Sequence, residues 1–271
     1  MTEAARAHGV GLVCLRDAEA VSRAGAEELW RAAARARAAG AALRVVLSGG
    51  STPRRMLECL AAERARVDWP RVELFFGDER PVPPDHPDSN YGMARRALLE
   101  PAGIAAERVH RLRGESADLD AAARDYQAEI ARACGVPASG PPPVFDLVYL
   151  GLGADGHTAS LFPGSPALAE ARRWVVANPL PRLATTRLTL TFPILNRAAR
   201  VVFLACGAEK APALAAVREG PRKVAELPAQ GVDPAPGALV WLVDAAAAAG
   251  LARRGAAPGA TRRPESEGTA C

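Results

Sequence analysis

Short apolar runs separated by helical patterns constrain the fold of this chain more than any other feature of its sequence. Most of the runs are continuous rather than alternating, as is typical of parallel strands that are covered on both faces of a sheet. The strand candidates are Val10–Leu15, Leu43–Leu47, Val72–Phe76, Leu147–Leu150, Arg187–Phe192, Val201–Ala205 and Leu239–Val243. The sequence therefore predicts a sheet with helices on both sides.

Helical patterns lie between these runs. The predicted helices are Asp17–Ala39, Pro53–Glu63, Ser89–Leu99, Asp118–Cys134 and Glu209–Arg218. Strands and helices that alternate at this spacing predict an α/β fold, a three-layer sandwich around a mainly parallel, Rossmann-like sheet. We expect residues 1–251 to form a single domain in which 135–145 is a surface connection. Residues 252–271 contain almost no large apolar side chains, so we expect a disordered tail.

The composition narrows the class of protein. The chain has 271 residues, of which 49% are hydrophobic, enough for a sizeable core. No window approaches the ~18 uninterrupted apolar residues of a transmembrane helix, and residues 1–17 do not have the pattern of a signal peptide. The 5 cysteines are scattered and lack any C-x-x-C spacing, which disfavours disulfides and a zinc site. We therefore expect a cytoplasmic protein that does not contact membranes.

The positive charge of the chain does not indicate nucleic-acid binding. The formal net charge is only +4, and the tail contributes half of it, with four basic residues against two acidic ones: Arg253, Arg254, Arg262, Arg263, Glu265 and Glu267. Arginine is used in place of lysine almost throughout, as a coding bias would produce. Arginine is not interleaved with aromatic residues, so we expect no nucleic-acid partner.

In open α/β sheets, ligands bind where loops leave the carboxyl ends of strands. The first such loop is Ser48-Gly49-Gly50-Ser51-Thr52, after which Pro53 opens a helix. The glycines let the backbone approach a ligand, and the amides of a helix start favour an anion. The loop predicts a phosphate cradle, although it lacks the lysine of a Walker A motif. The alternative is an ordinary turn in which Thr52 caps the helix.

The second loop follows the run that ends at Phe76. It carries Asp78, Glu79 and Arg80, three charges that are hard to bury and that we expect to face a cleft. Arg80 can bind a phosphate or carboxylate with two hydrogen bonds, and the two carboxylates can orient it. Asp88 or Ser89 is expected to cap the next helix. The alternative is a polar loop with a local ion pair.

The third loop reads LGLGADGHTASLFPG. Its glycines permit a tight path, from which Asp155 and His157 emerge. An imidazole titrates near neutral pH, so it can act as a general base, and a neighbouring carboxylate can fix its tautomer. The alternative is a histidine bonded to the backbone of a turn. His8, His86 and His110 have no such context.

The fourth loop follows the run that ends at Ala205. It places Lys210, one of the two lysines of the chain, in the first turn of a predicted helix. A lysine is slightly unfavourable there because of the helix dipole, which favours a role as a point charge for a phosphate. The alternative is a solvated surface side chain.

Taken together and in this order, the four loops resemble the 6-phosphogluconolactonases. The segments LSGGSTP, GDERPVPPDHPDSNYGMA, LGLGADGHTASLFPG and VVFLACGAEKAPAL are similar to motifs of that family, and the resemblance runs from about Val10 to Leu251. It implies a glucosamine-6-phosphate deaminase-like fold. It also implies a metal-independent carboxylic ester hydrolase of the oxidative pentose phosphate pathway, with a sugar phosphate as substrate and no cofactor. The oligomeric state is left open.

The resemblance also implies roles for the candidate residues. His157 activates a water that attacks the lactone carbonyl, and Asp155 orients His157 or that water. The 6-phosphate is held by Ser48, Gly49, Gly50, Ser51, Thr52, Asp78, Arg80 and Lys210. Amides of the loop from Gly151 to Gly156 are candidates for stabilising the oxyanion. No G-x-S-x-G elbow is present, so we do not expect a covalent intermediate.

Two alternatives remain from the sequence. Glucosamine-6-phosphate deaminases share the DGH motif, but Phe162 stands where their glutamate would transfer a proton. A non-catalytic sugar-phosphate sensor would carry a DNA-binding segment, for which the sequence leaves no room before Val10. One departure concerns the lactonase pattern itself. Leu180 replaces the lysine of a basic turn, so that Arg182 or Arg187 is the nearest source of positive charge.

Overall fold

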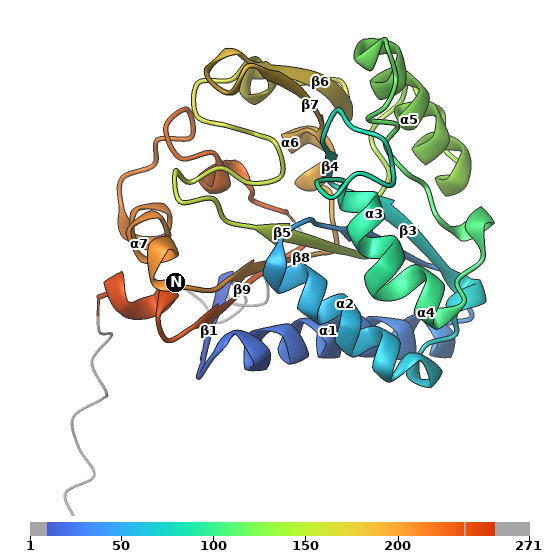
Figure 1. Ribbon diagram of the computed structural model, residues 1–271, viewed down its shortest axis with the longest axis horizontal. Coiled ribbons are helices and arrows are strands. Elements are labelled where there is room, and N and C mark those ends of the chain that lie inside the picture. The colour runs from blue at the N-terminus through green and yellow to red at the C-terminus, as the bar shows by residue number, and fades with distance from the viewer. Residues whose placement is uncertain (1–9, 236, 253–271) are drawn as a thin grey trace, which may run out of the picture.

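The computed structural model describes residues 10–235 and 237–252. A sheet of 6 strands lies at the centre, in the order β1-β9-β8-β5-β2-β3 (Figure 1). All of its strand pairs are parallel. The strands are β1 (Val10–Leu15), β2 (Leu43–Leu47), β3 (Val72–Phe76), β5 (Leu147–Gly151), β8 (Arg200–Ala205) and β9 (Ala238–Asp244). The mainly parallel sheet that the continuous apolar runs predict is therefore confirmed.

A second sheet, of 3 antiparallel strands, was not expected from the sequence. It contains β4 (Asp78–Glu79), β6 (Val175–Leu180) and β7 (Thr185–Leu190). The strand candidate Arg187–Phe192, counted with the parallel strands, is β7 of this second sheet, and α6 (Phe192–Leu195) begins where it was expected to end. Its polar first half is only partly buried, which suits an outer antiparallel strand.

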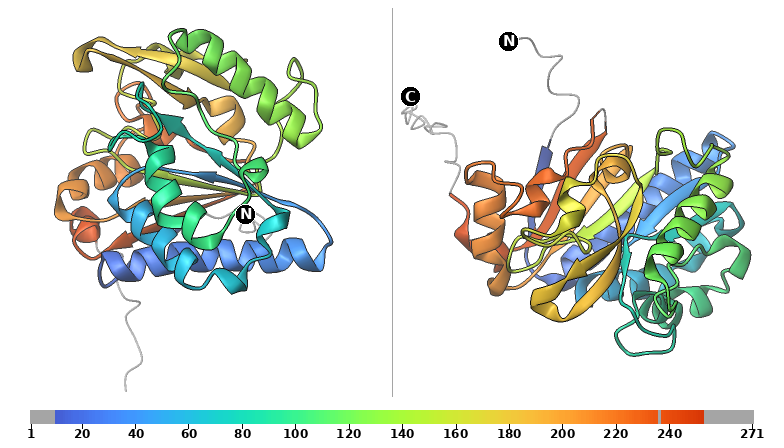
Figure 2. Two further views of the ribbon diagram at one scale, coloured as in Figure 1. Left: turned by 45° about the vertical axis from the view of Figure 1, so that its right-hand side comes forward. Right: turned by 90° about the horizontal axis from the view of Figure 1, so that it is seen from above.

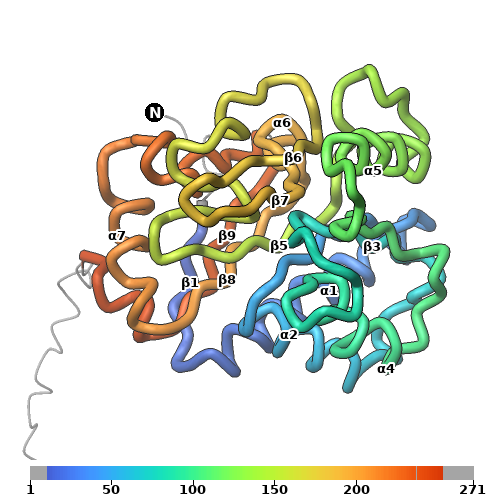
Figure 3. The backbone as a smooth tube through the Cα atoms, turned by 45° about the horizontal axis from the view of Figure 1, so that its top comes forward, coloured from blue at the N-terminus to red at the C-terminus, as the bar shows by residue number. Residues whose placement is uncertain are grey.

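Helices and the second sheet cover the two faces of the central sheet. Helix α1 (Ala18–Ala38) packs against α2 (Ser51–Ala62), and Figure 2 shows α1 lying along the sheet on the side away from the antiparallel strands. On the other side, α5 (Leu119–Cys134) packs against β6, as the tube of Figure 3 also shows. These layers give the three-layer sandwich that the sequence predicts.

The helix ends follow local capping rules. Asp17, Ser89 and Asp118 each accept a hydrogen bond from the backbone amide three residues later, which satisfies an amide that the helix leaves unpaired. The predicted helix at Ser89–Leu99 is α3 (Asn90–Ala94), a π-helical turn (Arg95–Leu99) and α4 (Glu100–Ala102). The predicted helix at Glu209–Arg218 is α7 (Ala211–Glu219), preceded by a 3-10 turn (Ala208–Lys210).

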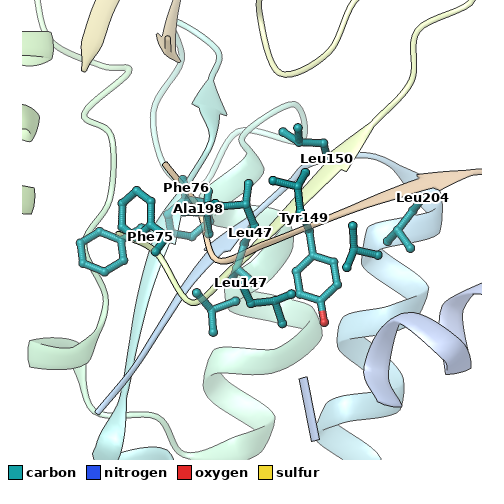
Figure 4. Close-up of a cluster of buried hydrophobic side chains, with 14 of the residues drawn as sticks. Leu47, Phe75, Phe76, Leu147, Tyr149, Leu150, Ala198 and Leu204 are labelled. Carbon is teal, nitrogen blue, oxygen red and sulfur yellow. The ribbon is translucent and has the colours of Figure 1, made fainter. Parts of the chain in front are cut away.

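Large side chains of the central strands fill the core between the layers (Figure 4). Phe75 and Phe76 of β3 and Tyr149 of β5 are fully buried. The Tyr149 hydroxyl donates to the Gly25 carbonyl of α1 at 2.7 Å, so burial leaves no unsatisfied group on this side chain. The packed core fixes the carboxyl ends of β2, β3, β5 and β8, from which the candidate loops emerge.

Some expectations concern regions at the margin of the structure. The surface connection 135–145 is exposed or partly exposed except at Pro143 and Phe145, and the fully buried Phe145 packs against Phe75 at a ring distance of 5.0 Å. Residues 253–271 of the expected tail lie outside the described residues. Within the described ranges, no helix is long and apolar enough to cross a membrane.

Candidate active site

Loops from the carboxyl ends of β2, β3, β5 and β8 meet at one pocket of about 320 Å³. The predicted site residues that line it are Ser48, Gly49, Gly50, Ser51, Thr52, Asp78, Arg80, His157 and Lys210. Asp155 lies behind His157 rather than in the lining. Parallel strands that end at the same edge of the sheet explain why loops so distant in sequence converge.

The glycines of the first loop are required by two different constraints. A side chain at Gly49 would place its Cβ 1.9 Å from the amide oxygen of Asn90. Gly50 has a φ of 107°, a backbone conformation that other residues rarely adopt. Gly50 is the cap residue of α2, and no side chain caps this helix, so Thr52 is not the cap. The first-turn amides of a helix have no intrahelical partner, so those of α2 can bind an anion.

The charges of the second loop are divided between the pocket and the interior. Asp78, only 7% exposed, lines the pocket and accepts hydrogen bonds from Ser160 Oγ at 2.7 Å and Asn90 Nδ2 at 3.0 Å. Arg80 also lines the pocket, and its guanidinium donates to the Asp88 carbonyl at 2.5 Å. These contacts hold both side chains near the carboxyl end of β3.

Glu79 corrects the expectation that all three charges face a cleft. It is 2% exposed, lies outside the pocket lining and accepts hydrogen bonds from the backbone amides of Arg80, Asn90 and Tyr91. Burial raises the pKa of Glu79 despite these bonds. Backbone amides can satisfy a carboxylate that lacks solvent, so Glu79 organises the loop. The Ser89 hydroxyl also donates to it, at 3.1 Å.

His157 and Asp155 form a close pair. Asp155 Oδ1 lies 2.5 Å from His157 Nδ1 and accepts from the His157 backbone amide at 3.1 Å. The hydrogen bond to His157 holds the pKa of Asp155 below its usual value. Because Asp155 occupies Nδ1, Nε2 is the ring nitrogen left for a ligand. An added Cβ at Gly153 would lie 2.0 Å from His157 Nδ1, so a larger residue there would displace the imidazole from this position.

Phe162 gives His157 a second support that the sequence did not predict. Its ring stacks on the imidazole with centroids 4.1 Å apart and an interplanar angle of 22°. The two residues lie on one short loop, in which Thr158 and Leu161 form an isolated β-bridge. Between them Ala159, which lines the pocket, has a φ of 47°, an uncommon conformation for a residue with a side chain. The loop therefore holds a fixed and locally strained geometry.

Lys210 reaches the pocket from the end of a 3-10 turn just before α7. Asp244, at the end of β9, holds this turn by accepting from the Gly207 amide at 3.1 Å and the Ala247 amide at 2.7 Å. Glu209 and Cys206 also line the pocket, and neither was singled out from the sequence. Burial raises the pKa of the Cys206 thiol to about 11, so it is protonated and a poor nucleophile at neutral pH.

The arrangement can position an anion and activate a water. Its lining combines hydrogen-bond donors and cations with an imidazole that a carboxylate orients. Among the residues that the structure describes, no group of three or more His, Cys, Asp or Glu side chains is placed to share a metal ion. The chemistry that its own side chains offer is general acid–base catalysis beside an anion site.

Comparison with known proteins gives a consistent result. Residues 16–241 match the family model described as glucosamine-6-phosphate isomerases/6-phosphogluconolactonase. A 6-phosphogluconolactonase of Synechocystis is 42% identical over 200 residues, which cover 74% of this chain and 81% of that protein. One of Mycobacterium tuberculosis is 40% identical, with 85% and 94% covered. The structure of 6-phosphogluconolactonase from Trypanosoma cruzi has a TM-score of 0.78 at 29% identity, with 90% and 97% covered.

Proposed function

Because the chain belongs to the glucosamine-6-phosphate isomerase/6-phosphogluconolactonase family, we propose that it hydrolyses 6-phosphoglucono-1,5-lactone to 6-phosphogluconate with His157 as the general base. The observation that carries this proposal is the pair formed by His157 and Asp155 at the edge of a pocket that also contains Arg80 and Lys210. The pair supplies the base, and the cations supply a place for the phosphate.

The reaction begins when water attacks the C1 carbonyl of the lactone. His157 Nε2 accepts a proton from that water as the new C–O bond forms. The tetrahedral intermediate then collapses, the bond between C1 and the ring oxygen breaks, and the imidazolium returns its proton to the ring oxygen. Asp155 keeps the proton-bearing Nδ1 turned away from the substrate and stabilises the imidazolium. A lactone is reactive enough for this route to require neither a metal nor a cofactor.

The phosphate is bound away from the reacting carbon. Arg80, Lys210 and the Ser48–Thr52 loop all line the pocket, and each offers donors suited to phosphate oxygens. Binding energy from this remote group positions C1 against His157. The backbone amides of the loop from Gly151 to Gly156 are the proposed donors to the oxyanion.

Phe162 supports hydrolysis over deamination of an amino sugar phosphate. A phenyl ring has no proton to transfer, and this ring is already engaged in the stack on His157. The deamination reaction needs a further acid or base at the position that Phe162 occupies. Release of ammonia from glucosamine 6-phosphate would contradict this assignment.

The test follows the loss of freshly prepared lactone with and without the protein, because the lactone also hydrolyses unaided. We expect acceleration by the wild type, a fall of about 10²-fold or more in kcat for His157→Ala, and mainly a higher KM for Arg80→Ala. A wild-type rate equal to the blank would contradict the assigned activity. Full activity of His157→Ala would leave the activity intact but contradict the role of His157.

A further inference from the structure

Arg187 of β7 lies close to Arg80, the residue that directly follows β4. The antiparallel pairing of β4 with β7 sets Asp78 against Thr189 and Glu79 against Leu188. Arg80 follows the last paired residue of β4, and one further step in this register would set it opposite Arg187. Like charges placed directly across an antiparallel pair destabilise it, so this arrangement requires a compensating interaction.

The protein itself supplies little compensation. Among the described residues, no hydrogen bond or ion pair involves the Arg187 side chain, and its Nε is buried without an acceptor. Arg80 Nε is also buried without an acceptor, and the guanidinium of Arg80 has the Asp88 carbonyl as its protein partner. Burial and the neighbouring Arg80 lower the pKa of Arg187, and the carboxylates of Asp78, Asp88 and Glu79 offset this only in part. A positive charge in this position is therefore held at a cost in free energy.

Arg200, elsewhere in the chain, shows the carboxylate partner that Arg187 lacks among the described residues. Arg200, which is also partly buried, donates two hydrogen bonds to the carboxylate of Glu28 at 2.6 and 2.9 Å. Near Arg187, the carboxylates of Asp78 and Glu79 are already engaged by the Ser160 hydroxyl and by backbone amides, respectively. The two opposed guanidinium groups therefore lack the anionic partner that a half-buried arginine has at Arg200.

We propose that Arg80 and Arg187 together form a phosphate subsite, in which Arg187 supplies the second positive charge for the phosphate group of the substrate. Two guanidinium groups match the charge of a phosphate dianion and its several acceptor oxygens. Arg80 lines the pocket and Arg187 does not, so Arg80 contacts the phosphate and Arg187 adds its charge from its position beside Arg80. Naming the ligand as a sugar phosphate rests on the proposed function.

Arg182 does not share this environment. It lies on the exposed 3-10 turn before β7, whereas Arg187 is half-buried within the strand. Leu180, which stands in place of a lysine at this turn, is 5% exposed and packs inward. Arg182→Gln therefore removes the same charge from the same region without altering the opposed pair, and it is the matched control.

The experiment measures binding of inorganic phosphate and of gluconate by titration calorimetry in the wild type, Arg187→Gln, Arg187→Lys and Arg182→Gln. We expect Arg187→Gln to bind phosphate about ten- to a hundredfold more weakly, with a smaller loss for Arg187→Lys, which keeps the charge but lacks the planar fork. Arg182→Gln should bind phosphate like the wild type. Gluconate, which has a carboxylate but no phosphate, should bind equally weakly to the wild type and to all three variants.

Thermal melting without ligand gives an independent readout. Because Arg187 faces Arg80 without an anion, Arg187→Gln should melt at the same temperature as the wild type or above it, as when a functional site is relieved of strain. A folded Arg187→Gln that binds phosphate like the wild type would overturn the subsite. A substitution at Arg187 that changes the affinity for gluconate but not for phosphate would also overturn it. The same holds for a lower melting temperature in Arg187→Gln together with unchanged phosphate affinity in Arg187→Lys.

The outcomes separate this subsite from the proposed function. Phosphate binding that depends on Arg187 in a protein that does not hydrolyse the lactone would support the subsite and contradict the activity. If the wild type hydrolyses the lactone and Arg187→Gln binds phosphate as the wild type does, the activity is supported and the subsite is contradicted.

Discussion

At the scale of single residues, the proposed base is held on three sides. Asp155 engages Nδ1 of His157, the backbone of Gly153 approaches the same edge of the ring, and Phe162 covers one face. A general base must present its free nitrogen in one direction to be effective. We infer that Asp155 fixes the tautomer of His157 and Phe162 fixes the plane of its ring.

Replacing Phe162 tests this division of roles. Phe162→Leu should lower kcat about three- to tenfold, since aromatic stacking contributes ~0.5–1.5 kcal/mol, and should leave KM nearly unchanged because the phosphate site is intact. Phe162→Tyr retains the ring and should restore most of the rate. Steady-state kinetics on fresh lactone measure both effects.

The same substitution in a His157→Ala background provides the control. If Phe162 acts through His157, Phe162→Leu should cost little further activity once the imidazole is gone. An equal loss in both backgrounds would show that Phe162 supports the fold of the loop rather than the orientation of the base.

At the scale of the elements, the phosphate cradle depends on the contact between the start of α2 and the start of α3. Asn90 of α3 is 3% exposed and donates to the backbone carbonyl and the carboxylate of Asp78 at 2.9 and 3.0 Å. Gly49 packs directly against the Asn90 amide. Two loops of the site are thus joined at a point where there is no room for a methyl group.

Gly49→Ala should therefore impair substrate binding more than turnover. The new Cβ would overlap the amide oxygen of Asn90, and the amide group cannot move without breaking the hydrogen bonds that its Nδ2 donates to Asp78. We expect KM to rise about tenfold, corresponding to ~1.4 kcal/mol, with a smaller change in kcat. Gly11→Ala is the control, because an added Cβ there would meet only Val240, at 3.7 Å. Equal kinetics for both variants would contradict this account of the cradle.

The elements also show which parts of the fold are visible in the sequence. The central strands are continuous apolar runs, and the loops that follow them carry the site, so both were predictable. The second sheet was not, because β6 contains Asn178 and Pro179 and β4 has only 2 residues. The stack of Phe162 on His157 and the opposition of Arg80 to Arg187 depend on how the chain folds back, which hydrophobic pattern does not encode.

At the scale of the whole molecule, a buried histidine connects the central sheet to the helical layer. His110 is 6% exposed and lies 2.9 Å from Glu73 of β3 and 2.9 Å from Glu129 of α5. Its ring stacks on Phe75 with centroids 4.5 Å apart. No pattern in the sequence singles out His110, because both carboxylates reach it from distant segments.

These contacts make the stability of the molecule dependent on pH. Burial lowers the pKa of His110, but the hydrogen bonds to Glu129 and Glu73 outweigh burial, and the net pKa is raised. A raised pKa means that the stabilisation is complete below the ordinary value of about 6.5 and is lost as the pH rises through the folded-state value. The pKa of Glu129 is lowered by the same hydrogen bond, so its contribution is lost only in acid.

His110→Gln should thus destabilise the protein more at pH 6 than at pH 9. At pH 6 the wild type holds an imidazolium between two carboxylates. The substitution removes this cation, which weakens the neutralisation of both carboxylates although Arg108 stays paired with Glu73 and Arg132 stays near Glu129. As the pH rises through the folded-state pKa, the histidine loses its charge, and glutamine then replaces it with less loss. Thermal melts at the two pH values measure the difference, with about 2–4 °C expected for each kcal/mol in a chain of this size. His86→Gln, which replaces an exposed histidine, is the control and should change the melting temperature equally at the two pH values. If His110→Gln lowers the melting temperature equally at both pH values, packing on Phe75 and not charge makes His110 stabilising.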